Sequence, residues 1–123
     1  LLDLVKEKER TYKTTFLINH RDQLIPLKTQ DISYFQIDTG VVKATTFDNK
    51  SYVIDGKLEE LEEELDPNNF YRINRQCILR RDALSKIKQN FNGKLIVEVT
   101  PSSAEQIVVS KAKAAEFKTW VAN

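Results

Sequence analysis

Short apolar and β-branched runs alternate with polar turns over most of the chain. This pattern predicts strands at residues 14–18, 24–27, 32–37, 41–47, 51–54, 70–73, 77–79, 86–89, 95–100 and 106–109. The turn between residues 89 and 95 contains Asn92-Gly93, a pair favoured in tight hairpins. We therefore expect a mostly β fold.

Two segments have helical spacing instead. Residues 57–65 place three leucines on one face and acids on the other, and Pro67 stops the helix. Ser110 is a suitable N-cap for a last helix from residue 111 to about 121. Residues 1–10 are typical of the end of a charged helix, with a frayed terminus as the alternative. The expected fold thus contains two short helices besides its strands.

Composition limits the chemistry. At 123 residues the chain is one domain, and its single Cys77 and single His20 supply too few ligands for a metal site. No nucleophile motif accompanies His20, and the glycines form no phosphate-binding loop. The sequence contains neither a signal peptide nor an apolar run near the ~20 residues that span a bilayer. We expect a cytoplasmic protein that is not an enzyme and has neither a cofactor nor a membrane partner.

Charge is spread unevenly along the chain. The formal net charge is +1, but residues 55–66 carry −6, which leaves +7 on the remainder. Residues 68–94 hold seven bases against Asp82. A basic face can bind phosphates while the acidic pole stays away from them.

The densest basic stretch is residues 70–81. Its apolar residues would hold the backbone to a core while its polar residues face outward. Five of its side chains suit phosphate oxygens or base edges: Arg72, Asn74, Arg75, Arg80 and Arg81. The alternative is a solvated basic strand. An aromatic platform for single-stranded nucleic acid is conceivable from Phe70, Tyr71 and Phe91, but their neighbours indicate core positions.

The order of these features resembles the LytTR family, the DNA-binding output domain of many bacterial response regulators. The resemblance covers roughly residues 14–120 and is carried by residues 27–35, 46–50, 58–61, 65–67, 70–75 (FYRINR), Ile87 and 109–111. It implies an elongated stack of small antiparallel sheets over residues 13–123. It also implies that residues 1–12 are a linker helix from an upstream receiver domain. The implied partner is double-stranded DNA, bound by loops in the major groove, with two domains paired as a homodimer or on repeated sites.

The resemblance also points to particular loops. Asn74 and Arg75 lie where the family contacts DNA. The hairpin at residues 38–43 is a further contact loop, but it lacks the His that reads bases in some members, so Lys43 and Thr39 remain as its candidates. Arg80 stands, with the arginine after it, where the family often has Asn and an apolar residue. These two arginines either add phosphate contacts or are solvated.

Two further candidates lie at the start of the last helix. Lys111 and Lys113 occupy its first turn, where the helix dipole disfavours cations, so a phosphate there would explain them. The alternative is that both are solvated. Arg72 is equally consistent with a DNA contact and with an ion pair to the acidic helix. A non-enzymatic β module that binds protein partners is the alternative function, and the sequence identifies neither the operator nor the regulated genes.

Overall fold

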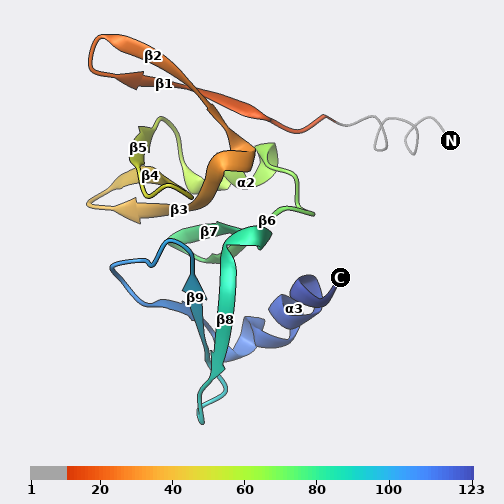
Figure 1. Cartoon of the computed structure of the whole chain (residues 1–123). Coiled ribbons are helices and arrows are strands. Elements are labelled where there is room, and N and C mark those ends of the chain that lie inside the picture. The colour runs from red at the N-terminus through yellow and green to blue at the C-terminus, as the bar shows by residue number, and fades with distance from the viewer. Residues whose placement is uncertain (1–10) are drawn as a thin grey trace, which may run out of the picture.

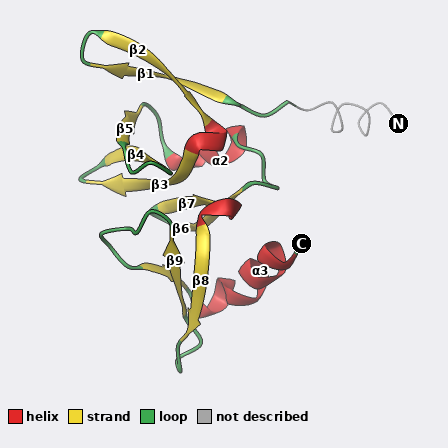
Figure 2. Cartoon of the chain, in the orientation of Figure 1, coloured by secondary structure: helices red, strands yellow, loops and turns green. Residues whose placement is uncertain are grey.

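The computed structural model describes residues 11–123, so the helix expected over residues 1–10 lies outside the described part. The described chain forms antiparallel strands, two α-helices and two 3-10 turns (Figure 2). In order they are β1 (Thr15–His20), β2 (Gln23–Lys28), a 3-10 turn (Thr29–Asp31), β3 (Ile32–Asp38), β4 (Val41–Thr46), β5 (Ser51–Ile54), α2 (Leu58–Glu64), β6 (Phe70–Asn74), β7 (Cys77–Arg80), a second 3-10 turn (Arg81–Ala83), β8 (Leu84–Gln89), β9 (Leu95–Val99), β10 (Ile107–Val109) and α3 (Lys111–Ala122).

The strands form three small sheets. These are β1-β2, the five-stranded β5-β4-β3-β7-β6, and β10-β9-β8, with every recorded pairing antiparallel. Figure 1 shows them stacked, with β1-β2 at one end and the β8–β9 hairpin at the other. The expected mostly β stack of small antiparallel sheets with two helices is confirmed.

The five-stranded sheet separates two cores. Because side chains alternate across a strand, Phe35 and its cross-strand partner Ile78 face one core, while Tyr34 and Leu79 face the other. The first core is closed by β1, β2 and α2, and the second by the three-stranded sheet and α3. The long basic stretch therefore belongs to a central sheet covered on both faces.

Several element boundaries differ from the prediction. The β1–β2 turn contains only Arg21 and Asp22, because His20 pairs with Gln23 and Arg21 adopts a φ of 58°. Strand β8 begins at Leu84, two residues earlier than expected, and the pairing shifts register near its start. Neither 3-10 turn was predicted, since a three-residue turn leaves no hydrophobic period to detect.

Candidate nucleic-acid interface

Two other segments, the β3–β4 hairpin and the β10–α3 junction, lie next to the β6–β7 turn. The backbone N–H of Ile37, near the end of β3, donates to the carbonyl of Gln76 in that turn (2.9 Å). On its other side, Nδ2 of Asn74 donates to the carbonyl of Val108 in β10 (3.1 Å). The β3–β4 hairpin, the β6–β7 turn and the β10–α3 junction are thus joined by hydrogen bonds.

The β6–β7 turn is held rigidly from within. Asn74 and Cys77 are paired, so Arg75 and Gln76 form the turn, and Oδ1 of Asn74 accepts from the Gln76 N–H (2.8 Å). The guanidinium of Arg72 donates to the carbonyls of Asn74 (3.2 Å) and Arg75 (2.9 Å). The side chains of Arg72 and Asn74 therefore fix the backbone that carries Arg75.

Arg75 itself points into solvent. Its residue is exposed, and within residues 11–123 no carboxylate lies within ion-pair distance of its guanidinium. A planar guanidinium on a fixed turn can donate two parallel hydrogen bonds to a phosphate or to a guanine edge.

Arg72 pairs with the acidic helix. Its side chain is only 14% exposed and lies 3.2 Å from Oε1 of Glu59 and 3.5 Å from Oε1 of Glu62. Hydrogen bonding from its own backbone N–H and from Arg72 lowers the pKa of Glu59 below its usual value. Of the two roles left open for Arg72, the ion pair with α2 is present in the structure.

Arg80, at the end of β7, is bonded to the 3-10 turn that follows β2. Its side chain is 13% exposed, donates to the carbonyl of Thr29 (3.3 Å), and stacks 5.2 Å from the ring centroid of Phe70. Its Nε lies 3.5 Å from Oδ2 of Asp82.

Arg81 holds the end of α3. It donates to the carbonyls of Trp120 (2.6 Å) and Asn68 (2.9 Å) and lies 3.9 Å from the Trp120 ring centroid. A cation at a helix C-terminus satisfies carbonyls that have no partner within the helix.

The two lysines of α3 differ in their surroundings. The helix is capped as expected, with Ser110 Oγ accepting from the Lys113 N–H (3.3 Å). Nζ of Lys113 donates to the Arg72 carbonyl (3.0 Å) and lies 5.3 Å from the Tyr71 ring centroid. Lys111 is exposed, and its aliphatic stem packs so closely on Gly93 that a Cβ there would lie 2.9 Å from Lys111 Cγ. Of the two, only the Lys111 ammonium has no hydrogen-bond or ion-pair partner among residues 11–123.

The β3–β4 hairpin is tight and strained. Thr39 and Gly40 have φ values of 50° and 78°, and Thr39 Oγ1 donates to the Asp38 carbonyl (2.7 Å). A β-branched residue with positive φ costs roughly 1–3 kcal/mol, so the Thr side chain is presented at the tip against its backbone preference. Lys43 lies 3.1 Å from Oδ2 of Asp38 and so neutralises the one acid that would repel phosphate.

The β8–β9 hairpin, at the opposite end of the stack from β1 and β2, differs from one expectation. Phe70 is buried and Tyr71 half-buried, but Phe91 is fully exposed at 101%, so the expected core position of Phe91 is wrong. The turn that holds it projects beyond the body of the protein, where no core is available. Lys86 and Lys94, on the same hairpin, are exposed bases that were not among the predicted contact residues. The Asn-Gly turn between two lysine-bearing strands was the signal for them.

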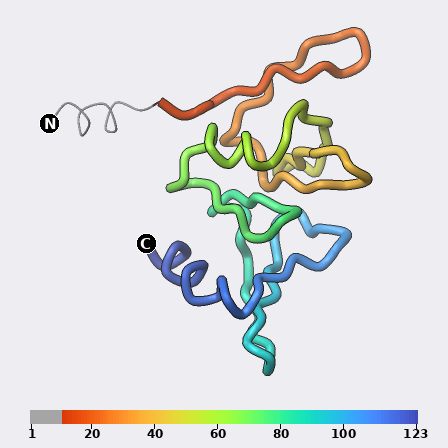
Figure 3. Tube along the Cα trace, turned by 180° about the vertical axis from the view of Figure 1, so that it is seen from behind, coloured from red at the N-terminus to blue at the C-terminus, as the bar shows by residue number. Residues whose placement is uncertain are grey.

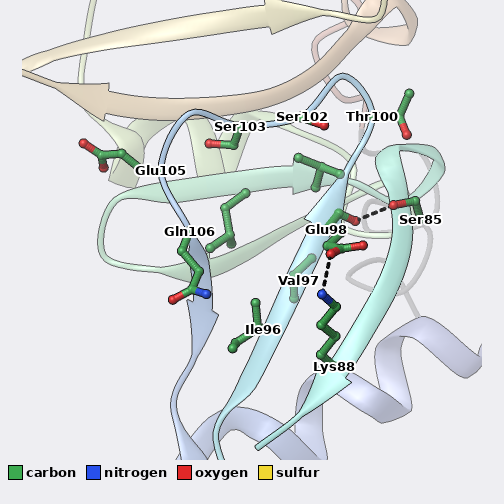
Figure 4. Close-up of a pocket in the computed structure, with 12 residues that line it drawn as sticks. Ser85, Lys88, Ile96, Val97, Glu98, Thr100, Ser102, Ser103, Glu105 and Gln106 are labelled. Carbon is green, nitrogen blue, oxygen red and sulfur yellow. Dashed lines mark hydrogen bonds and ion pairs between the residues drawn. The ribbon is translucent and has the colours of Figure 1, made fainter.

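A cavity of about 470 Å³ lies beside β9 (Figure 4). Among its polar side chains, Lys88 pairs with Glu98 (2.9 Å), and Ser85 Oγ donates to the Glu98 carbonyl (3.0 Å). In the part of the chain that the structure describes, no three metal-ligating side chains converge. Of the helices in residues 11–123, none has the length and apolarity to span a membrane.

Three small stacked sheets, with polar loops joined by hydrogen bonds, define a small β-rich domain. The sequence profile of the LytTr DNA-binding domain matches residues 22–122. The chain belongs to the LytTr DNA-binding domain family.

Two relatives illustrate this membership. The sensory transduction protein LytT of Bacillus subtilis (strain 168) is 28% identical over 97 residues, which are 79% of this chain and 39% of LytT. The chain thus matches well under half the length of that relative. The fold is that of the LytTr DNA-binding domain of a Bacillus cereus protein described as a methyl-accepting/DNA response regulator. The TM-score is 0.76 at 17% identity, over 90% of this chain and 99% of the other.

Proposed function

We propose that this domain binds specific sites in double-stranded DNA by inserting its three joined loops into the major groove. The observation that carries the proposal is the β6–β7 turn. Arg72 and Asn74 fix its backbone, while Arg75 has neither an ion-pair partner nor a covering element among the described residues. A rigid turn that presents one free guanidinium reduces the entropy lost when a base or phosphate is bound.

The surrounding loops would complete the contact. In this proposal Lys111 binds a phosphate together with the free N–H groups at the start of α3. Thr39 and Lys43 approach the DNA from the β3–β4 hairpin. Asn74 mainly shapes the turn, and its second amide hydrogen remains for a base edge.

Three basic residues whose side chains are already hydrogen-bonded within the protein have a different role. Arg72, Arg80 and Lys113 each donate to backbone carbonyls in neighbouring elements. In this proposal they position the interface and contact phosphate at most with a remaining hydrogen. Phosphate contacts from the free bases would supply most of the affinity and its dependence on salt.

The wider role extends the same proposal. As the output domain of a transcriptional response regulator, the chain would follow a receiver domain joined through residues 1–12. Two copies would bind paired sites, and the protein would act in the bacterial cytoplasm. Selection of bound duplexes from a random pool would identify the target sequence.

The test compares Arg75→Ala with Lys118→Ala, which removes one exposed cation from α3 outside the three loops. A lost base or phosphate contact of about 1–3 kcal/mol predicts that Arg75→Ala weakens binding to the selected duplex about 5- to 150-fold. Lys118→Ala should change it little, and both variants should keep the melting temperature. Equal affinity of Arg75→Ala and wild type would reject the turn as the contact element. An absence of salt-dependent duplex binding by the wild type would reject the proposed function as a whole.

A further inference from the structure

The most exposed apolar side chain of the described residues belongs to Phe91. It is 101% exposed, against 65% for Leu17 and 60% for Leu24, which lie on the first hairpin. Figures 1 and 3 both show the β8–β9 hairpin reaching past the rest of the molecule, with the turn at residues 90–94 at its end. The Phe91 ring belongs to neither hydrophobic core, so it is available for contact with a partner.

The turn that carries Phe91 is well ordered by hydrogen bonds. The N–H of Gly93 donates to the Asn90 carbonyl (3.0 Å), and the N–H of Phe91 donates to Asn90 Oδ1 (3.0 Å). Asn92 Oδ1 accepts from the Lys94 N–H (3.1 Å), and Gly93 has a φ of 84° that favours glycine. The ring is thus presented by a fixed turn.

The hairpin that carries this ring is rich in lysine. Residues 86–96 contain three lysines and no acid. Lys88 is paired with Glu98, whereas Lys86 and Lys94 are exposed and have no carboxylate within ion-pair distance in residues 11–123. The cores of protein–protein interfaces are depleted in lysine, so this surrounding disfavours a protein partner. It favours a polyanion that also offers an apolar surface.

The hairpin tip is next to the interface described above. Gly93 is in contact with the stem of Lys111, the free cation at the start of α3. A duplex whose phosphate meets Lys111 would therefore pass beside the tip and the ring of Phe91.

We propose that the β8–β9 hairpin is a second DNA-contacting element, in which Phe91 enters the minor groove flanking the site bound by the three loops. Apolar wedges in that groove partly unstack a base step and bend the duplex, while Lys86 and Lys94 bind the adjacent phosphates. The inference rests on the proposed function, because it requires the same duplex to be bound by the loops.

The test uses the full domain, a selected duplex with long flanks, and fluorophores at both duplex ends. Phe91→Ala should lower affinity about five-fold or more and reduce the bend measured by energy transfer. Leu24→Ala, which removes an exposed apolar side chain from the first hairpin, should change neither. Both variants should keep the melting temperature, because neither side chain is buried.

A nested set of duplexes, shortened from each end, locates the contact. Wild type should lose its Phe91-dependent affinity once the duplex ends before the flank, and Phe91→Ala should show no such step. If Phe91→Ala matches wild type in affinity and bend, the inference is wrong while the proposed function stands. If wild type binds no duplex, both are wrong.

Discussion

Arg72→Ala is the substitution that best separates a framework role from a DNA contact. The wild-type guanidinium donates to the carbonyls of Asn74 and Arg75 and pairs with Glu59 and Glu62. Hydrogen bonds to charged groups contribute about 1.5–3 kcal/mol each. The hydrogen bond from Arg72 to the Asn74 carbonyl is long (3.2 Å), and the one to the Arg75 carbonyl is exposed to solvent. We therefore expect Arg72→Ala to lower the free energy of unfolding by roughly 2–4 kcal/mol. The two exposed glutamates add little to this figure, because water screens their attraction.

Urea or thermal denaturation measures the loss of stability. Arg72→Lys should recover less than half of it, since an ammonium cannot bridge two carbonyls as a planar fork does. The pH dependence gives a further check. The lowered pKa of Glu59 stabilises the fold above the usual glutamate value near 4.5, and this contribution is lost as the pH falls through the folded pKa. Stability of Arg72→Ala should therefore depend less on pH in this acid range.

DNA binding completes the experiment. If Arg72 only holds the turn, Arg72→Ala weakens binding but leaves the slope of log affinity against log salt unchanged. If Arg72 neutralises a phosphate, the slope falls by ~0.9. A variant that keeps wild-type stability, or that loses ~0.9 of slope, would refute the framework role argued from these contacts.

Four other substitutions test three separate features. Thr39→Asn should stabilise the fold by about 0.5–1.5 kcal/mol in urea denaturation, because Asn tolerates positive φ before Gly, and a loss of stability would contradict the strain at this turn. Lys113→Ala should cost about 1 kcal/mol through the lost bond to the Arg72 carbonyl, whereas Lys111→Ala should be neutral or slightly stabilising; equal effects on the melting temperature would refute the distinction. Burial raises the pKa of Cys77 to about 12, so its thiol should resist alkylation at pH 8 while the protein is folded. Stability should fall above about pH 9, where only the unfolded thiol ionises, and Cys77→Ala should reduce that fall.

The strands could be predicted because each is a short apolar or β-branched run bounded by polar turn residues. Such runs identified β3 and β7, whose first residues are buried on both faces of the sheet, and leucines at helical spacing identified α2. The same reasoning failed for Phe91, whose apolar character was read as burial. Whether the turn of a hairpin is buried or exposed depends on how the sheets stack, and this cannot be predicted from the local sequence.

The roles of the basic residues were harder to predict for a related reason. A strand pattern gives the face of an arginine, but not whether a backbone carbonyl lies within its reach. Arg81 illustrates this: its partners in α3 are about 40 positions further along the chain. Long-range bonds of this kind become visible only when the layers are placed together.

The contacts also explain how a chain with a net charge of +1 can carry a DNA interface. Arg72 pairs with Glu59 and Glu62 beside the turn, and Lys43 pairs with Asp38 in the hairpin, so the charge of these acids is partly offset near the loops. Other acids of α2 lie on its outer face, and charges beyond the Debye length of about 8 Å at physiological salt are largely screened. The field felt by an approaching phosphate is then set by the few cations without partners, not by the total. Local pairing, rather than overall pI, is therefore the quantity that should predict the salt dependence of binding.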